Sequence, residues 1–313
     1  MTVRELQGRD AADLLRFMKR YFPEEEALLG TRPEGFFEVV RRIFRWDVRF
    51  ILGLLRLVGR PVFRFFVVEE AGRLVATTLL TFSRRAGYVS MVVVDPAWRR
   101  RGLAQSLLER ARAASRARGR PYLVLDVLAA NTPARALYGR LGFRTLRETA
   151  YFVQERPDGG AAPAAVVPGL RPFRSEDARA LVATARRVRP AVVEEVLPAT
   201  EREFTGSAWE GDLLASERAA WVIDDGAGAV AWVAAAVSRA TEAGHLSSPI
   251  LAASLDPERA LGLVTTATRW CADRGSPRVL AMVPEENERG RAALVGAGFR
   301  EAIPVLTLYR GVS

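Results

Sequence analysis

Residues that bind metals or form cross-links are scarce in this 313-residue sequence. It contains one cysteine (Cys271), one histidine (His245) and one lysine (Lys19). A disulfide framework needs cysteines in pairs, and structural zinc sites are built from several Cys and His side chains. The composition therefore excludes both within one chain, predicts no metal and indicates a reducing compartment. Cys271 is expected to be a small buried helix residue, and His245 a structural histidine in a strand.

Long apolar runs are also missing. The most apolar stretch, residues 50–55, is flanked by Arg49 and Arg56. A membrane-spanning helix needs about 20 consecutive apolar residues. The first ten residues are polar and lack the apolar centre of a secretory signal peptide. We therefore expect a cytoplasmic protein with no membrane partner.

Positive charge is concentrated in the first half of the chain. The formal net charge is +10, and residues 1–158 hold 29 Lys plus Arg against 17 Asp plus Glu. The remainder holds 17 against 19. An anionic ligand of the first half would explain this asymmetry. Heavy use of arginine along the whole chain would explain the arginine count, but not its concentration.

A linker near the middle predicts two domains. Residues 154–169 read QERPDGGAAPAAVVPG, with many turn-forming residues and few large apolar ones. Such a composition is typical of a linker, and the chain length favours two domains of about 150 residues. We predict a first domain over 1–154, a linker over 155–168 and a second domain over 169–313.

The two domains repeat one order of elements. In the first, the patterns predict a hairpin at 62–83, a strand at 88–94, a helix from Leu103, a strand at 122–128 and a helix ending at Gly142. In the second, they predict a hairpin at 221–239, a strand ending at Asp256-Pro257, a helix at 259–274, a strand at 278–283 and a helix closing on Gly298-Phe299. Residues 131–143 align without gaps with 287–299, which indicates an internal duplication.

The most informative motif follows the strand that contains Val92, Val93 and Val94. It is a short basic loop, Asp95-Pro96-Ala97-Trp98-Arg99-Arg100-Arg101-Gly102, that leads directly into the helix at Leu103-Ala104. The first backbone N–H groups of a helix have no partners within it, and the helix dipole adds partial positive charge there. Such a terminus suits a pyrophosphate. Gly102 and Ala104 leave room for the phosphates, and the three arginines add donors.

Arg-x-x-Gly-x-Ala after an apolar strand resembles the signature of the GNAT acetyltransferase superfamily. A second family element, from Asn131 through Tyr138 to Gly142-Phe143, follows in the family's order and spacing. The resemblance covers about residues 1–153 in full and 169–313 in outline. It implies an α/β (α+β) fold of two tandem GNAT-like domains, each a mixed, mostly antiparallel central sheet flanked by helices.

The resemblance also implies a co-substrate, acetyl-CoA, held between two splayed strands near residues 92–94 and 122–128. The backbone of Val92, Val93 and Val94 would pair with the pantetheine arm. Arg99, Arg100, Arg101, Gly102, Leu103 and Ala104 would hold the pyrophosphate. Asn131, Ala134 and Tyr138 would bind the CoA side from the next helix.

The implied reaction is direct attack of a neutral primary amine on the thioester in a ternary complex. A backbone amide near Val93 or Val94 would polarise the carbonyl oxygen, and Tyr138 would protonate the departing sulfur. Many relatives have a glutamate base where this chain has Ser90. A water relayed to Asp126, or to the glutamates at 24–26, would replace it. A structural Asp126 and a solvated helix end at 24–26 remain the alternatives.

The second half departs from the motif. After Asp256-Pro257 it reads Glu258-Arg259-Ala260-Leu261-Gly262-Leu263, without Arg-x-x-Gly-x-Ala, and Leu294 stands at the position of Tyr138. We therefore expect a degenerate copy that has lost the acetyl-CoA site and helps to shape the acceptor site.

Three functions compete. An N-acetyltransferase would bind a small-molecule or peptide amine through the aromatic, basic segment 21–60, which otherwise is an amphipathic helix pair over the core. A non-catalytic acyl-CoA sensor would fit the missing glutamate at Ser90, but not the retained Tyr138. Nucleic-acid binding predicts salt-dependent affinity, but no recognition motif supports it, so no nucleic acid is expected. We expect a monomer or a homodimer.

Overall fold

The structure is a computed structural model, and it describes residues 2–21, 63–157, 166–205, 217–238 and 243–312. The chain forms two compact units, which interleave along the sequence. The first unit contains residues 1–127, 131–146 and 307–313, and the second contains residues 128–130 and 147–306. No helix in these described ranges is long and apolar enough to cross a membrane.

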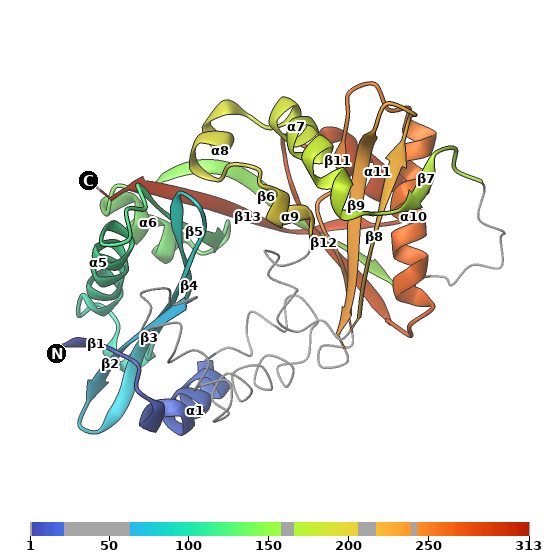
Figure 1. Ribbon diagram of the computed structural model, residues 1–313. Coiled ribbons are helices and arrows are strands. Elements are labelled where there is room, and N and C mark those ends of the chain that lie inside the picture. The colour runs from blue at the N-terminus through green and yellow to red at the C-terminus, as the bar shows by residue number, and fades with distance from the viewer. Residues whose placement is uncertain (1, 22–62, 158–165, 206–216, 239–242, 313) are drawn as a thin grey trace. The chain divides into compact units, whose positions relative to one another are not determined.

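The sheet of the first unit runs in the order β1-β2-β3-β4-β5-β13. Its strands are β1 (Val3–Glu5), β2 (Phe63–Glu70), β3 (Arg73–Phe82), β4 (Ala86–Val94), β5 (Tyr122–Leu128) and the end of β13 (Arg300–Gly311) (Figure 1). Strands β1 to β4 pair antiparallel, and β4 pairs with β5 in parallel. Its helical elements are η1 (Gly8–Asp10), α1 (Ala11–Tyr21), η2 (Pro96–Trp98), α5 (Leu103–Arg116) and α6 (Thr132–Arg140).

Apolar side chains at helical spacing hold α1 and α5 against this sheet. Leu14, Phe17 and Met18 of α1 form one cluster with Phe65 and Val67 of β2. On α5 the buried residues are Leu103, Leu107, Leu108, Ala111, Ala114 and Ser115. Complete burial of one leucine side chain contributes about 1.5–3 kcal/mol. The helix predicted from Leu103 is therefore confirmed, and its apolar residues form the buried face of α5.

The sheet of the second unit runs in the order β6-β12-β10-β9-β8-β7, with β11 paired to β9 and β13 beside β6. Its strands are β6 (Arg144–Glu155), β7 (Leu170–Pro172), β8 (Glu217–Asp224), β9 (Ala229–Ser238), β10 (Ala243–Leu246), β11 (Ile250–Leu251) and β12 (Arg278–Pro284). Its helical elements are η3 (Ser175–Asp177), α7 (Ala178–Val188), α8 (Ala191–Val196), α9 (Glu201–Phe204), α10 (Pro257–Ala272) and α11 (Glu288–Gly296). Here β10 and β12 are the parallel pair.

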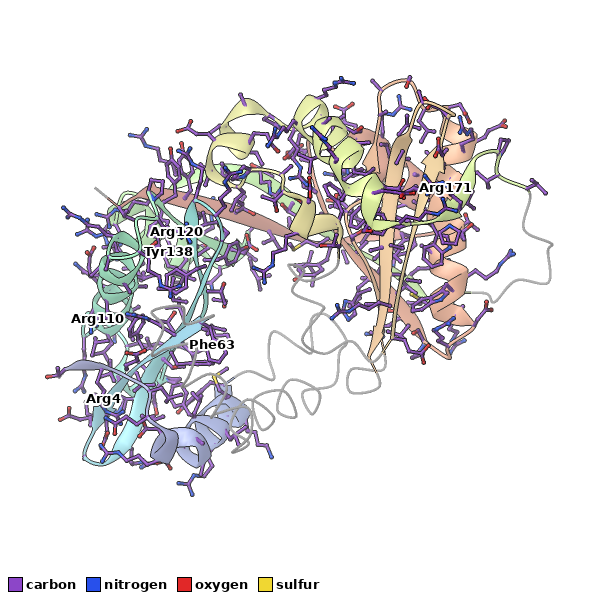
Figure 2. The ribbon with its side chains drawn as sticks, viewed as in Figure 1. Arg4, Phe63, Arg110, Arg120, Tyr138 and Arg171 are labelled. Carbon is purple, nitrogen blue, oxygen red and sulfur yellow. The ribbon has the colours of Figure 1, made fainter. Side chains whose placement is uncertain are left out.

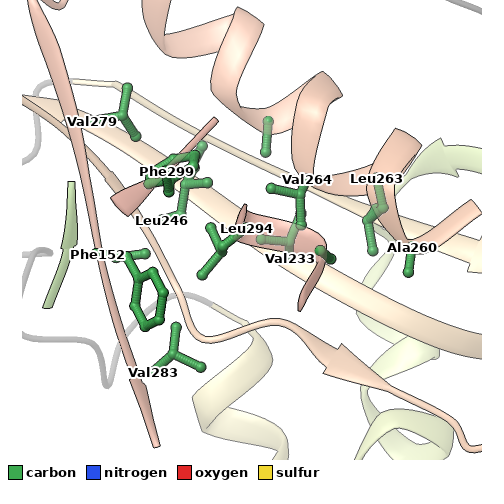
Figure 3. Packing of buried hydrophobic residues seen from close by; sticks show 14 of the residues in the cluster. Phe152, Val233, Leu246, Ala260, Leu263, Val264, Val279, Val283, Leu294 and Phe299 are labelled. Atoms are coloured by element: carbon green, nitrogen blue, oxygen red, sulfur yellow. The ribbon is translucent and has the colours of Figure 1, made fainter. Parts of the chain in front are cut away.

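A core between the sheet and α10 and α11 holds the second unit together. Figure 3 shows Leu263 and Val264 of α10 and Leu294 of α11 near Val233 and Phe152 of the sheet. A second cluster contains Leu181 of α7, Phe204 of α9 and Trp232 of β9. Both units thus combine a mixed, mostly antiparallel sheet with flanking helices, as the resemblance implied.

Local packing repeats between the units, at an offset of 157 residues for the strand glycines and 156 for the helix residues that they contact. A Cβ added at Gly87 of β4 would lie 2.6 Å from Ser115 Oγ of α5. A Cβ added at Gly244 of β10 would lie 2.8 Å from Cys271 Sγ of α10. In each unit a small residue therefore lets the helix approach the strand closely. Burial raises the pKa of the Cys271 thiol to about 12, so this cysteine is the buried packing residue predicted.

Helix ends repeat as well. The Asn131 side chain accepts a hydrogen bond from Ala134 N at the start of α6, and the Asn287 side chain accepts one from Gly290 N at the start of α11. At the other end, Phe143 N donates to Tyr138 O at 3.0 Å, and Phe299 N donates to Leu294 O at 3.0 Å. These matching caps support the duplication and place Leu294 at the position of Tyr138.

An arginine–aspartate pair, which the sequence analysis missed, is also duplicated. Arg4 holds both carboxylate oxygens of Asp10, at 2.6 and 2.9 Å, and Arg171 holds those of Asp177 at 2.8 and 2.7 Å. Figure 2 labels both arginines, one in each unit. The arginine hydrogen bonds lower the pKa of each aspartate. Each pair ties a short strand, β1 or β7, to the 3₁₀ turn that follows it.

The compact units follow the predicted domains only in outline. The end of β6 pairs with β12 in the second unit, from Thr149 opposite Pro284 to Glu155 opposite Arg278. Residues 307–313 belong to the first unit. The predicted domain boundaries at 154 and 169 stay a prediction about the duplicated sequence. The amphipathic helix pair expected within 21–60 lies, after Tyr21, outside the described residues.

One predicted strand boundary differs. The sequence suggested a strand ending at Asp256, but β11 ends at Leu251 and a turn precedes Asp256. The reason is local: Asp256 is the N-cap of α10 and Pro257 is its first residue. Proline suits this position because its missing N–H would have no partner in the helix.

Candidate active site

The two parallel strands of the first unit separate halfway along their length. Pairing of β4 with β5 begins at Ala86 opposite Tyr122 and ends at Val89 opposite Leu125. Beyond this point β4 continues to Val94 and β5 to Leu128 without being paired to each other. A wedge therefore opens between the strands where the resemblance placed acetyl-CoA.

A β-bulge in β4 lies at the start of the wedge. Leu79 of β3 is opposite Ser90, but Thr77 is opposite Val93, so β4 has one extra residue here. Met91 has a φ of 54°, which is uncommon for a residue other than glycine. Bulges bend the strand that contains them. The bulge thus explains why β4 turns away from β5.

Backbone alternation shows which β4 amides face the wedge. Asp95 N donates to Val75 O at 2.9 Å, so this amide points toward β3. Successive residues of an extended strand direct their N–H groups to opposite edges. The N–H groups of Val92 and Val94 therefore point away from β3, and that of Val93 points toward it. The Val93 side chain packs against the α1 cluster.

The loop after β4 forms a concave arrangement of backbone amides. Arg100 has a φ of 61° and Gly102 a φ of 76°. Alternating left-handed residues turn successive N–H groups into one concavity that binds anions. Gly102 is the N-cap of α5, and no side chain caps this terminus. A Cβ at Gly102 would have no neighbour within 4 Å, so open space adjoins the uncapped amides.

Arginine side chains surround this loop. Arg99, Arg100 and Arg101 are exposed. Arg101 lies over the ring of Trp98 at 4.5 Å, and Arg99 Nε donates to Val94 O at 3.3 Å. These contacts place two guanidinium groups beside the loop. The terminus therefore combines free amides, the helix dipole and arginine charge.

Tyr138 lies on α6, and its counterpart in the second unit shows whether packing at this position needs a hydroxyl group. Its side chain is 6% exposed, and its ring centroid is 5.8 Å from that of Phe143. In the second unit, Leu294 fills the same position with an apolar side chain that is fully buried. Packing at this position therefore does not require a hydroxyl group.

A second polar pair, which includes a residue that the sequence analysis missed, lies at the start of the wedge. The Tyr88 hydroxyl of β4 donates a hydrogen bond to Asp126 Oδ2 of β5. The other oxygen, Asp126 Oδ1, is buried and has no hydrogen-bond partner within the described part of the chain. Tyr88 is paired with Val124, two residues before Asp126, so the two side chains share one face of the sheet. The two residues are 38 positions apart, so the sequence alone gave no indication that they are in contact.

Ser90 belongs to the same face. It is opposite Leu79, whose side chain packs against the α1 cluster. Side chains of opposite residues lie on the same face of a sheet, so Ser90, Tyr88 and Asp126 all lie on the face covered by α1. The glutamates at 24–26 and the segment 22–60 lie outside the described residues.

The described residues of the second unit contain no equivalent of the phosphate-type loop, by which we mean residues 95–102 before α5. Asp256 Oδ1 accepts a hydrogen bond from Arg259 N at 2.8 Å at the start of α10, and Glu258 lies in the first turn. These carboxylates already interact with the positive end of the helix dipole, and their negative charge would repel a phosphate. The terminus of α10 therefore does not fit a pyrophosphate, whereas that of α5 does.

Side-chain hydrogen bonds also link α11 to the segment 248–253 that precedes α10. Asn287 Nδ2 donates to Ser248 Oγ at 3.0 Å and to Pro249 O at 2.7 Å. Arg289 Nη1 donates to Ala253 O at 2.8 Å. In the first unit the corresponding region borders the wedge. In the second unit these hydrogen bonds link its two sides directly.

No group of three metal-binding side chains occurs in the described parts of the chain. Burial lowers the pKa of His245 to about 4. This histidine lies in β10 opposite Leu280 and Ala236. It is neutral at pH 7 and lies in the second unit, outside the wedge.

A mixed sheet with two splayed parallel strands and an uncapped helix after the first is the architecture of the GNAT acetyltransferases. Residues 18–143 match the model of the acetyltransferase (GNAT) family. This part of the chain therefore carries a GNAT acetyltransferase-family domain, and its membership supports acyltransferase activity with an acyl-CoA substrate.

Solved structures extend the likeness over the whole chain. A tandem GNAT protein from the clavulanic acid biosynthesis pathway has a TM-score of 0.63 at 17% identity, covering 100% of this chain and 98% of that one. A GCN5-related N-acetyltransferase from Sphaerobacter thermophilus has a TM-score of 0.64 at 18% identity, with coverages of 99% and 95%. At these identities the likeness establishes the tandem GNAT fold. No protein of curated function matched the sequence.

Proposed function

We propose that this protein is an N-acetyltransferase that transfers an acetyl group from acetyl-CoA to a primary amine through its first unit. The observation that carries the proposal is the contrast between two duplicated helix ends. The α5 terminus is uncapped and basic, and the α10 terminus is capped by a carboxylate. This contrast favours one acetyl-CoA site per chain.

The pyrophosphate would bind at the amides of Leu103 and Ala104 and at Arg99, Arg100 and Arg101, with Gly102 leaving space for it. The pantetheine arm would pair with the wedge-facing backbone of Val92 and Val94. Val93 would contribute through its side chain. Asn131 and Ala134 would contact the CoA side of the wedge. The side-chain oxygen of Asn131, Oδ1, also caps α6 by accepting a hydrogen bond from Ala134 N.

The acceptor amine attacks the thioester carbon as its C–S bond breaks, and the amide nitrogen then loses a proton. The N–H groups of Val92 and Val94 face the wedge, and one of them would stabilise the carbonyl oxygen as it gains charge. Tyr138 would donate a proton to the sulfur, as a general acid. Leu294 fills the duplicated position in the second unit, so apolar packing alone does not account for a tyrosine here.

Asp126 is our candidate for the base. Most amines are protonated at pH 7, so a proton must leave before the nitrogen can attack. The free oxygen, Asp126 Oδ1, would accept it directly or through a water near Ser90. Tyr88 would act as a positioning residue that holds the other carboxylate oxygen.

A non-catalytic acyl-CoA sensor is the alternative. It would use the same loop, but it would not need the Tyr138 hydroxyl or the free Asp126 oxygen. The small-molecule or peptide identity of the amine is left to a screen of acceptors. Neither alternative requires a metal.

Calorimetric titration with acetyl-CoA tests the proposal, with Gly102→Glu as the critical variant. We expect one site per chain, and a loss of affinity on the order of 100-fold in the variant, because at least two charge-assisted hydrogen bonds would be lost. Gly72→Glu is a matched control: Gly72 has a φ of 73° and, like Gly102, no neighbour within 4 Å of an added Cβ.

Both substitutions should cost similar stability, because each places a side chain on a left-handed residue. Only Gly102→Glu should lose the ligand. Two sites per chain would contradict a degenerate second unit. No binding would reject the enzyme and the sensor together, and binding without turnover of any amine would favour the sensor.

A further inference from the structure

Three arginines gather at the end of the first unit that lies away from the phosphate-type loop. Arg64 is the second residue of β2, and Arg118 and Arg120 follow the C-terminal end of α5. Helix α5 has 14 residues and is therefore about 21 Å long at roughly 1.5 Å per residue. The phosphate-type loop precedes the N-terminal end of α5, whereas Arg118 and Arg120 follow its C-terminal end. The cluster is therefore separate from the proposed acetyl-CoA site.

The three guanidinium groups repel one another. Burial lowers the pKa of Arg118, and the charges of Arg64 and Arg120 lower it further. Glu5 offsets part of this charge, with its Oε1 4.0 Å from Arg64 Nε. Arg84 and Arg85, in the neighbouring turn between β3 and β4, add exposed positive charge. Like charges held close together on partly buried side chains are unfavourable unless an anion joins them.

Two donors of the cluster are unused. Arg64 Nε and Arg120 Nε are both buried, and neither has a hydrogen-bond partner among the residues that the structure describes. A buried donor without a partner costs about 1–3 kcal/mol. The cost falls on two members of one cluster, so a ligand with two or more acceptor oxygens would satisfy both.

The side chains are held in place before any ligand binds. Arg120 Nη1 donates to Arg84 O at 2.5 Å, and Figure 2 labels Arg120. The Arg118 guanidinium lies over the ring of Phe82, 4.3 Å from its centroid. Such contacts reduce the entropy lost on binding. The planar guanidinium fork also matches the oxygens of a phosphate.

The negative end of the α5 dipole explains only part of the cluster. A helix C-terminus carries about half of an elementary negative charge. Arg116 lies in the last turn of α5 and is placed to interact with that charge. The dipole does not explain why Arg64 comes from a different element, or why two Nε groups are left without acceptors.

We propose that Arg64, Arg118 and Arg120 form a second anion site, which binds a phosphate group independently of acetyl-CoA. The phosphate is supplied either as inorganic phosphate or as the monoester of a small metabolite. The chemistry of recognition is the same for both: an oxyanion receives hydrogen bonds from the Nε and Nη groups.

Calorimetry on the full chain, saturated with CoA so that the α5 loop is occupied, tests the site. Inorganic phosphate and glycerol 3-phosphate are the two probes, at an ionic strength kept constant with chloride. In Arg118→Gln/Arg120→Gln we expect phosphate affinity to fall on the order of 100-fold, about tenfold for each charged hydrogen-bond donor. Tighter binding of glycerol 3-phosphate identifies a metabolite, and equal binding identifies free phosphate.

The matched control is Arg110→Gln/Arg116→Gln, which removes two charges from the same helix outside the cluster. It should change phosphate affinity by less than about threefold, since exposed charges are screened by salt. Equal losses in both variants would overturn the site, and so would an absence of phosphate binding by the unaltered chain. Binding of duplex DNA without binding of either probe would also overturn it.

Acetyl-CoA stoichiometry serves as the check that each variant is folded. If Arg118→Gln/Arg120→Gln does not fold, Arg64→Lys replaces it. This variant keeps the charge and removes one unused donor, so phosphate affinity should fall about tenfold. Unchanged affinity in Arg64→Lys would reject the assigned geometry.

Discussion

Arg310 of β13 donates a hydrogen bond from its Nη1 to Glu109 Oε1 of α5 at 3.1 Å, across 201 positions of the sequence. The same strand places Tyr309 against Tyr122, with ring centroids 6.1 Å apart. Val312 N also donates to Pro121 O at 2.9 Å. The first unit therefore contains a strand segment that comes from the last part of the chain.

Removal of residues 307–313 should disable the first unit. The β5 edge would lose its neighbour, and the contacts to Tyr122 and Glu109 would be lost. We expect acetyl-CoA binding to disappear in calorimetry and limited proteolysis to cleave within the first unit. Arg310→Ala alone should cost at most about 1 kcal/mol, because this ion pair is partly exposed. A truncated chain with unchanged acetyl-CoA affinity would contradict this assignment.

Tyr138→Phe should separate catalysis from binding. Loss of a general acid lowers turnover by about 10²–10⁴-fold, and phenylalanine keeps the ring contact with Phe143. We expect kcat to fall within that range while the Kd for acetyl-CoA changes less than twofold. Tyr122→Phe, on a strand of the same unit, is the control. Full turnover in Tyr138→Phe would remove this residue from the mechanism.

The Tyr88–Asp126 pair should control the acid side of the pH–rate profile. Asp126→Asn removes the proposed base, so kcat/KM for the amine should fall about 10²-fold or more. Its acid limb should also change shape. Tyr88→Phe should cost less, about tenfold, because it only frees the carboxylate to rotate. An unchanged pH profile in Asp126→Asn would show that the carboxylate is structural.

His245 should make the chain less stable in mild acid. Its pKa is about 4 in the folded chain and about 6.5 when unfolded. Because the folded pKa is lowered, its contribution is complete above about pH 6.5 and is lost as the pH falls toward 4. The total is about 3 kcal/mol, at roughly 1.4 kcal/mol per pKa unit.

Urea denaturation measures this effect. Between pH 6.5 and 5 the free energy of unfolding should drop by about 2 kcal/mol. His245→Gln should remove most of the drop, since His245 is the one histidine of the sequence. Asp10 and Asp177 have lowered pKa values, so they titrate below this range. An equal drop in His245→Gln would assign the effect to other groups.

Features encoded by neighbouring residues could be predicted from the sequence. The apolar stripe of α5 and the basic loop before it follow from residues within one helix and one turn. The Asn131 and Asn287 caps follow from an Asn at the start of an apolar pattern. The 12-residue spacing from each Asn to its Gly-Phe pair also marked the duplication.

Features that depend on strand pairing could not be predicted. The bulge at Met91 arises because β3 pairs with residues on both sides of it, and methionine itself gives no signal for a left-handed backbone. The Tyr88–Asp126 contact requires the parallel register of β4 and β5. Both residues lie inside strands, where polar side chains usually indicate a solvent-facing position.

The origin of the last strand segment was equally hidden. Tyr309 and Arg310 lie in an ordinary alternating strand, and nothing near them specifies the helix that they contact. Arg4 and Asp10 are likewise six residues apart with no shared period. Long-range pairs of this kind are determined by topology, which single-sequence patterns do not report.

The placement of residues 307–313 sets an order for folding during synthesis. A ribosome makes the first unit's other helices and strands early, but the segment beside β5 emerges only after the residues of the second unit. Until then the β5 edge is unpaired, and open edges are prone to association with other chains. Contacts between residues so distant in sequence also slow folding. Nascent chains of this protein should therefore depend on chaperones until residues 307–313 have emerged.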